Sequence, residues 1–188
     1  MDRRNIEKPL IYLTGFMGAG KTTIGAELGA NCHLPVVDTD QIIVQTYKQT
    51  ISEMFQLHGE PYFRKAEESI LTKLSKRTAP TIVTTGGGII MRKQNRQKMK
   101  QSGIIIYLHC DFNIIMQRLQ QDTSRPLLQQ HNRKSFSELF LTRLKHYLEC
   151  DYVIDTTYKS VSTIVKEICF ILNRTDHIGD PHIIGSEG

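Results

Sequence analysis

Short apolar runs alternate along the chain with longer amphipathic segments. The runs are rich in isoleucine and valine: LIYLT (10–14), LPVVD (34–38), TIVTT (81–85), IIIYLH (104–109) and YVID (152–155). Within each run apolar and polar residues barely alternate, which is typical of strands that are buried on both faces of a parallel sheet. The pattern therefore predicts a parallel sheet built from these segments.

The segments between the runs carry apolar residues at helical spacing. One face of a helix predicted over residues 22–32 holds Ile24, Leu28 and Cys32. A helix predicted over residues 62–76 has a similar face made of Phe63, Ala66, Ile70 and Leu74. Residues 39–60 are expected to be mainly helical, and further helices are predicted at 111–121, 135–149 and 160–173. Strands that alternate with helices predict an open, doubly wound α/β sheet.

The chain of 188 residues is long enough for one domain with a substantial core, which we place at residues 1–173. Residues 122–135 (DTSRPLLQQHNRKS) are polar and contain a proline, so they predict a long loop of the kind that often acts as a lid. After Asn173, glycine, proline and charged residues mix without periodicity, which predicts a disordered tail over residues 174–188.

Composition narrows the setting in which the protein works. No apolar run approaches the roughly 20 residues of a membrane helix, and the N-terminal segment lacks the pattern of a secretion signal. We therefore expect a cytoplasmic protein without a membrane partner. The cysteines form no Cys-x-x-Cys pair, so we expect neither structural zinc nor disulfides and interpret them as small buried side chains: Cys32, Cys110, Cys150 and Cys169.

A formal net charge of +5 raises the question of nucleic-acid binding. The basic residues are dispersed rather than gathered in a tail, as in the stretch Arg92, Lys93, Arg96, Lys98 and Lys100. We interpret that stretch as the solvated face of a helix, and we expect no nucleic-acid partner.

A glycine-rich motif follows the first predicted strand. Residues 15–22, GFMGAGKT, fit the pattern G-x-x-x-x-G-K-[ST] in its required place between a strand and a helix. Such a loop turns several backbone N–H groups toward one anion, and the following helix N-terminus adds partial positive charge. Lys21 would bridge the β- and γ-phosphates of a nucleotide, and the Thr22 hydroxyl would ligate Mg²⁺. Because the chain is small and lacks the N-K-x-D base reader of GTPase switches, it is best interpreted as a small kinase.

Two carboxylates, Asp38 and Asp40, stand two positions apart where the second predicted strand ends. Ligands of open α/β sheets bind at this edge. If strand geometry continues to residue 40, both side chains face the same crevice. The alternative is that Thr39 or Asp40 caps a helix beginning at Gln41, and capping does not exclude a functional role.

Glycines and arginines supply further candidates for an acceptor site. The stretch 86–88, GGG, follows the third strand at the same edge, and this position favours a meeting point of ligand and backbone N–H groups over a flexible turn. Arg64, Arg125 and Arg143 could each bind an anion or lie on a solvated surface. Arg64 could also pair with Glu67 or Glu68, and spacing alone leaves these alternatives open.

Taken together, the motifs resemble those of the shikimate kinase family. The resemblance runs from Leu10 to about Asn173 and rests on stretches in the family's order and spacing: GFMGAGKTT (15–23), DTD (38–40), GEPYFRKAE (59–67), GGG (86–88), DTSRPLL (122–128), RLKHY (143–147) and VIDTT (153–157). It implies a P-loop NTPase-type fold with a five-stranded parallel sheet in the order 2-3-1-4-5, helices on both faces and a lid. It also implies a monomer that uses ATP and one Mg²⁺ to phosphorylate the 3-hydroxyl of shikimate, in aromatic amino-acid biosynthesis.

The resemblance also implies roles for the acceptor and metal candidates. Asp40 would hold the 3-hydroxyl and act as general base, and Asp38 would orient Mg²⁺ beside Thr22. Arg64 and Arg143 would hold the carboxylate of shikimate, because a guanidinium forks onto a planar anion. The ring hydroxyls would meet the backbone of Gly86, Gly87 and Gly88, with Gly87 at the centre.

On the ATP side, the resemblance implies that Arg125 closes over the phosphates from the lid and that Arg118 stacks on adenine. After the last strand such kinases often carry an adenine-holding arginine, and in this chain only Lys159 could take its place. The catalytic set would be Lys21, Asp40 and Arg125, and the remaining ATP contacts would come from Gly18, Ala19, Gly20, Thr22 and Thr23.

Two other functions compete with this interpretation. A gluconate or nucleoside monophosphate kinase would share the architecture, but the DTD and GGG motifs and the two acceptor arginines argue against it. A P-loop regulatory or nucleic-acid-binding protein is suggested by the basic charge balance, but no cluster of base-stacking aromatic residues supports it.

Overall fold

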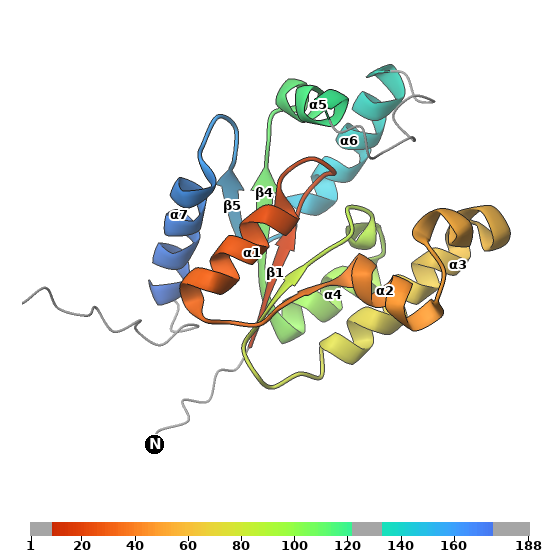
Figure 1. Ribbon diagram of the computed structural model, residues 1–188, viewed down its shortest axis with the longest axis horizontal. Helices are drawn as coiled ribbons and strands as arrows, with labels where there is room; N and C mark the ends of the chain where they lie inside the picture. Colours follow the sequence, from red (N-terminus) through yellow and green to blue (C-terminus); the bar gives the residue numbers. More distant parts are fainter. Residues whose placement is uncertain (1–8, 122–132, 175–188) are drawn as a thin grey trace, which may run out of the picture.

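The structure of the chain is a computed structural model, which describes residues 9–121 and 133–174. Its strands form one parallel sheet in the order β2-β3-β1-β4-β5 (Figure 1), which confirms the predicted architecture. The strands are β1 (Leu10–Thr14), β2 (Val36–Asp38), β3 (Thr81–Thr84), β4 (Gly103–His109) and β5 (Tyr152–Asp155). Two of them, β1 and β5, have the predicted boundaries.

Helices connect the strands, and each predicted helical segment is helical in the structure. Their bounds are α1 (Lys21–Cys32), α2 (Thr39–Tyr47), α3 (Ile51–Leu74), α4 (Lys93–Ser102), α5 (Phe112–Gln121), α6 (Arg133–Tyr147) and α7 (Val161–Arg174), with a short 3₁₀ turn η1 (Ile89–Met91) before α4. Of the predicted lid at 122–135, residues 122–132, which include Arg125, lie outside the described residues. Residues 133–135 form the start of α6. The tail predicted at 174–188 likewise lies outside them after Arg174, the last residue of α7.

The central strand β1 shows how the sheet separates two apolar cores. Leu10 and Tyr12 belong to a core with side chains of α3, α4, α5 and α6. Ile11 and Leu13 belong to a second core with α1 and α7. Because neighbouring residues of a strand point to opposite faces, an unbroken apolar run is needed to fill both cores.

The expectation of strands buried on both faces holds for β1, β3 and β4 but is wrong for the edge strands. Val36 in β2 is 38% exposed and Val153 in β5 is 50% exposed. Each edge strand has a neighbouring strand on one side only, so its outer edge and the side chains beside it are open to solvent.

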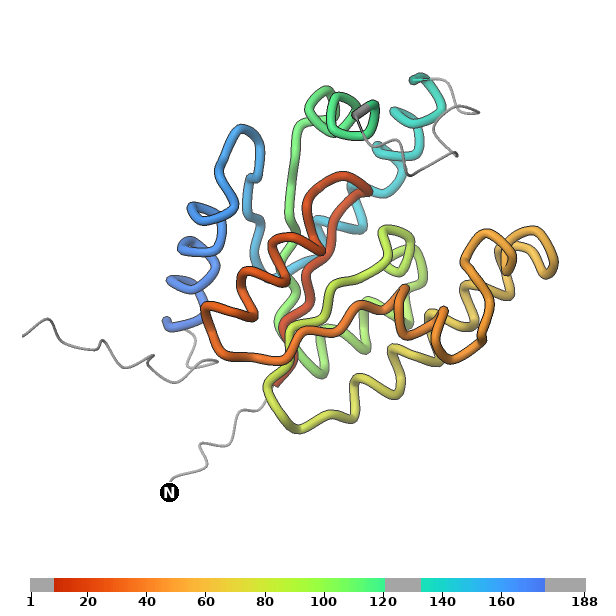
Figure 2. Tube along the Cα trace, viewed as in Figure 1, coloured from red at the N-terminus to blue at the C-terminus, as the bar shows by residue number. Residues whose placement is uncertain are grey.

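The α2–α3 pair, orange to yellow in Figure 2, extends to one side of the sheet. Thr50 is the N-cap of α3 and forms a capping box with Glu53. The Thr50 hydroxyl accepts from the Glu53 backbone N–H, and the Glu53 carboxylate accepts from the Thr50 N–H. Gly59 interrupts the helix with φ 74° and ψ 171°, a backbone that side chains rarely tolerate. The kink turns the second half of α3 back onto the sheet.

The basic stretch on α4 differs from the predicted solvated face. Arg96 is only 8% exposed, and its Nε donates to Glu149 Oε2 at 2.7 Å. Lys98 Nζ donates to the Thr72 hydroxyl at 2.6 Å. Packing of α4 against α3 and the end of α6 therefore uses charged side chains that the sequence pattern assigned to solvent. Within the described residues, no helix has the length and apolar character needed to cross a membrane.

The cysteines are free, as expected, but only Cys110 is buried. Cys32 at the end of α1 and Cys169 in α7 are half-buried, with their Sγ atoms 3.6 Å apart. The two Sγ atoms are close because α1 and α7 pack side by side on one face of the sheet.

Candidate functional site

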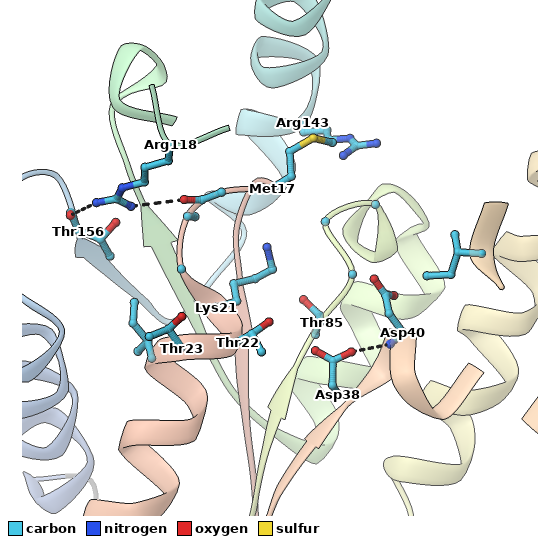
Figure 3. A pocket seen from close by; sticks show the side chains of 18 of the residues that line it. Met17, Lys21, Thr22, Thr23, Asp38, Asp40, Thr85, Arg118, Arg143 and Thr156 are labelled. Atoms are coloured by element: carbon cyan, nitrogen blue, oxygen red, sulfur yellow. Dashed lines mark hydrogen bonds between the residues drawn. The ribbon is translucent and has the colours of Figure 1, made fainter. Parts of the chain in front are cut away.

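A cavity of about 660 Å³ opens where the strands end at their carboxyl edge (Figure 3). This is the place where ligands bind in open α/β folds. Every predicted site residue that the structure describes lines it: Gly18, Ala19, Gly20, Lys21, Thr22, Thr23, Asp38, Asp40, Arg64, Gly86, Gly87, Gly88, Arg118 and Arg143. Arg125 lies outside the described residues.

The glycine-rich loop between β1 and α1 forms one wall of the cavity. Gly18 and Gly20 have φ angles of 78° and 89°, in the left-handed region, and Gly20 is the N-cap of α1. The Lys21 ammonium donates to the carbonyls of Gly15 and Phe16 at 2.8 and 2.9 Å. The lysine thus folds back across the loop, where an anion bound by the backbone N–H groups would meet its charge.

Asp38 caps α2, which begins at Thr39 rather than at Gln41. Its Oδ1 accepts from the backbone N–H groups of Asp40 and Gln41 at 2.9 and 3.1 Å. Its Oδ2 accepts from the Thr84 hydroxyl at 2.7 Å. Strand geometry therefore does not continue to residue 40, because the Asp38 carboxylate stabilises a helical turn immediately after it, so capping holds here, with Asp38 as the cap. Both carboxylates still line the same cavity, as Figure 3 shows.

The residue between the two carboxylates ties β2 to the glycine stretch after β3. Thr39 is fully buried, and its hydroxyl accepts the backbone N–H of Gly86 at 3.0 Å. Gly86 also packs against Asp40 so closely that a Cβ atom at position 86 would overlap Oδ1 of that carboxylate. The two motifs therefore form one unit, in which Gly86 must lack a side chain for Asp40 to stay in place.

Arg64 projects from the second half of α3 with a side chain that is only 12% exposed. Its Nε and Nη2 donate to Glu60 Oε1 at 2.9 and 2.8 Å, and its Nη1 donates to Glu67 Oε2 at 2.7 Å. The guanidinium also lies against Gly88, where a Cβ atom would overlap it. These contacts fix Arg64 at the cavity wall, so it is not the solvated arginine that spacing alone allowed.

Glu67 is a site residue that sequence reasoning did not identify. It lines the cavity, its side chain is 1% exposed, and its Oε1 makes no hydrogen bond within the described part of the chain. Burial raises the pKa of Glu67 to about 7, Arg64 opposes the rise, and Asp40 adds to it. A signal was present, because Glu67 follows Phe63 by four residues and so lies on the apolar face of the helix.

Arg143 reaches the cavity from α6 (Figure 3). Its guanidinium carbon lies 5.7 Å from the centre of the Phe16 ring, within the range of a cation–π contact. Its Nε is buried and makes no hydrogen bond among the residues that the structure describes. A buried donor that lacks a partner costs free energy unless a ligand accepts from it, so Arg143 is suited to hold an anion.

The far end of the cavity is closed by Arg118 from α5. Its guanidinium donates to the carbonyls of Gly18 at 3.3 Å and Thr156 at 3.4 Å, so it bridges the glycine-rich loop and the segment after β5 (Figure 3). Lys159 also lines this end, and its Nζ forms an ion pair with Glu167 at 2.8 Å. The positive charge expected after the last strand is thus present, with a carboxylate beside it.

Comparisons with known proteins agree with this geometry. The family model described as shikimate kinase matches residues 17–173. A shikimate kinase from Bacillus mycoides is 46% identical over 158 residues, which are 84% of this chain and 94% of that protein. The solved structure of a shikimate kinase from Acinetobacter baumannii in complex with shikimate has a TM-score of 0.83 and 33% identity, and the match covers 90% of this chain and 96% of that one. A gluconokinase from Sinorhizobium meliloti, with a TM-score of 0.53, 18% identity and coverage of 92% and 95%, is similar in fold alone.

Proposed function

The chain belongs to the shikimate kinase family, an ATP-dependent kinase family with an alcohol acceptor, and we propose how its cavity transfers the γ-phosphoryl group of ATP to the 3-hydroxyl of shikimate. One observation carries the proposal. The phosphate-binding loop with Lys21 and the acceptor candidates Asp40, Arg64 and Arg143 line a single cavity. A donor phosphate and a small anionic alcohol can therefore be held side by side.

The ATP half of the proposal rests on the glycine-rich loop. Its backbone and the N-terminus of α1 would hold the phosphates, and the Lys21 ammonium would exchange its carbonyl acceptors for phosphate oxygens. Arg118 would contact adenine at the end of the cavity that Thr156 and Lys159 line. Arg125 keeps its proposed role over the phosphates on the strength of its place in the DTSRPLL motif.

The acceptor half rests on the unit formed by the glycine stretch and α3. Arg64 and Arg143 would hold the shikimate carboxylate from two sides of the cavity, since both are partly buried and both point guanidinium nitrogens at the 86–88 stretch. This leaves the 3-hydroxyl to Asp40, at the end of the stretch nearest the Asp38 cap. Asp40 would accept the hydroxyl proton as the oxygen attacks the γ-phosphorus and ADP leaves. Phosphoryl transfer depends mostly on such positioning and on charge stabilisation.

The donors at the phosphate end fit Mg²⁺. The Thr22 hydroxyl and the Asp38 carboxylate line the cavity and are hard oxygen ligands. Because Asp38 already accepts three hydrogen bonds, it would reach the ion through water. The described residues hold no cluster of three or more His, Cys, Asp or Glu side chains that could bind a metal alone. That absence fits an ion that shares its ligands with phosphate and water and, when bound, neutralises phosphate charge.

An acceptor panel tests the proposal. ADP release, coupled to NADH oxidation, is measured with Mg²⁺–ATP and either shikimate, gluconate, AMP or single-stranded DNA. We expect stimulation by shikimate only. Stimulation by gluconate or AMP would assign the cavity to another small-molecule kinase, and stimulation by DNA would favour a nucleic-acid-dependent ATPase.

The quaternary state and location are part of the same proposal. We propose a monomer, because the described candidate residues of a single chain line one cavity, and we propose that it works in the cytoplasm, as the sequence predicts. Light scattering at assay concentration should give a mass close to the 21.5 kDa of one chain. A mass of twice that value would replace the monomer by a dimer.

A further inference from the structure

Every backbone carbonyl of the glycine stretch (86–88) and of the 3₁₀ turn η1 (Ile89–Met91) accepts a hydrogen bond. Backbone N–H groups of Ile89 and Met91 donate to the carbonyls of Gly86 and Gly88 at 3.2 and 3.0 Å. The other carbonyls of residues 86–91 accept from side chains, namely Asn95 to Ile89, Arg96 to Ile90 and Met91, and Tyr147 to Gly87. Three of these four bonds come from α4, which follows the turn. Within residues 9–121 and 133–174, the Gly87 carbonyl alone is held from a distant element.

That distant donor is Tyr147, the last residue of α6. Its hydroxyl donates to the Gly87 carbonyl at 2.6 Å across 60 positions of sequence. The side chain is 1% exposed, and its ring stacks on Tyr107 in β4 with centroids 5.0 Å apart and planes 6° from parallel. Burial raises the pKa of Tyr147 well above its ordinary value, so the hydroxyl keeps its proton and remains a donor. The stacked ring thus aims a permanent donor at one peptide of the cavity wall.

Tyr147 lies one helical turn after Arg143, so one helix face carries both. Around Gly87 the two side chains approach from the same side. A Cβ atom at position 87 would lie 3.5 Å from Arg143 Nη1, 3.5 Å from the Tyr147 hydroxyl and 3.5 Å from the Gly15 carbonyl. Gly87 therefore sits where α6, the phosphate-binding loop and the acceptor cavity meet, and the Tyr147 bond sets its distance from Arg143.

We propose that Tyr147 is a positioning residue for the acceptor. It fixes the Gly87 peptide against Arg143, so that the backbone and the guanidinium that contact shikimate are presented as one rigid surface. The inference rests on the proposed acceptor roles of Gly87 and Arg143. Tyr147 does not line the cavity and touches no substrate, so it acts through its neighbours there, the Gly87 peptide and the Arg143 guanidinium.

The test removes one oxygen atom. Tyr147→Phe keeps the ring and its stacking on Tyr107 but leaves the Gly87 carbonyl without its donor. We expect the shikimate KM to rise about tenfold, the scale of one lost hydrogen bond to a buried group, while the ATP KM and kcat stay within about twofold. The matched control is Tyr107→Phe, which removes the stacked partner's hydroxyl and its 3.1 Å bond to His109 Nδ1. The control should leave the shikimate KM unchanged.

The outcomes separate this inference from the proposed function. If wild-type protein shows no shikimate-dependent turnover, the proposed function fails. If wild type is active and Tyr147→Phe has the wild-type shikimate KM, only the role of Tyr147 is overturned. Two further results would overturn the positioning role of Tyr147 and assign its hydroxyl to core stability. One is an equal rise of the ATP and shikimate KM values, and the other is a Tm loss that unfolds the variant at the assay temperature. Amide NMR adds a direct readout, because resonances near Gly87 should shift while those of α7, which packs in the other core, do not.

Discussion

Gly86 packs directly against the carboxylate of Asp40, and a single methyl group at position 86 would overlap Oδ1. The same glycine donates its N–H to Thr39, the residue just before Asp40. The position of the Asp40 carboxylate, the proposed base, therefore depends on the lack of a side chain at Gly86, which follows the neighbouring strand β3. This relationship connects the two motifs that the sequence shows separately.

The Gly86→Ala variant should displace the Asp40 carboxylate while leaving the phosphate-binding loop intact. A misplacement of about 1 Å at a reacting group can cost about 100-fold in rate, so we expect kcat to fall on that order. The ATP KM should stay within about twofold of wild type. Steady-state kinetics with both substrates varied, together with a thermal unfolding curve, would check this. A wild-type kcat in a folded variant would show that Asp40 tolerates the movement.

Asp40→Asn keeps the size of the side chain but removes its ability to accept a proton. General acid–base steps contribute about 100-fold or more, so kcat should fall by at least that factor while shikimate still binds. Single-turnover kinetics separate chemistry from product release. Turnover near that of wild type would limit Asp40 to orienting the hydroxyl.

Arg64→Lys should chiefly raise the shikimate KM, by about tenfold or more, because an ammonium cannot reproduce the guanidinium fork. A matched control is Arg92→Lys. Arg92 pairs with Glu68 at 2.8 Å, much as Arg64 pairs with Glu67, but it does not line the cavity. Kinetics of both variants against shikimate are the measurement. Equal KM values for the two variants would return Arg64 to a structural role.

Glu67 makes the stability of the fold depend on pH. Burial raises its pKa from 4.5 to about 7, so between these values the folded protein holds a proton that the unfolded chain releases. Its contribution is therefore fully present below about pH 4.5 and is lost as the pH rises through 7. The difference in unfolding free energy between wild type and Glu67→Gln should fall by up to about 3 kcal/mol from pH 5 to pH 8.

Urea unfolding of both proteins at the two pH values measures this difference. The neutral glutamine serves as the control, because it has nearly the size of glutamate and does not titrate. A difference that stays constant with pH would mean that the Glu67 carboxyl titrates alike in the folded and unfolded states.

Much of this fold could be predicted from the order of apolar runs and amphipathic segments, because each strand and helix must bury a face of its own. The strand order could not be derived in this way and came only from the family resemblance. The edge strands were mistaken for buried ones, since an apolar run does not tell whether a strand has one neighbour or two. Val153 is half exposed in a run that looked like core.

Site residues could be predicted where a sequence motif fixes the local backbone geometry. They could not be predicted where a residue gains its role only by being buried in the folded chain. Lys21 and Asp40 stand in motifs whose place after a strand brings them to the cavity. Glu67 and Arg96 look like ordinary charges on helices, and only tertiary packing buries their side chains. Glu67 then pairs with Arg64 of the same helix, and Arg96 pairs with Glu149. The turn at Asp38 could not be decided from sequence, because an aspartate can end a strand or cap a helix, and only the positions of the Asp40 and Gln41 N–H groups distinguish the two.

The most direct test of the central claim is to identify the product. Wild-type protein is incubated with Mg²⁺–ATP and shikimate, and the product is examined by ³¹P and ¹H NMR. We predict one phosphomonoester whose phosphorus couples to the proton on C3, formed in equal amount with ADP. A phosphate coupled to a different ring proton, or ADP formed without any phosphorylated shikimate, would contradict the placement of the 3-hydroxyl at Asp40 and the account built on it.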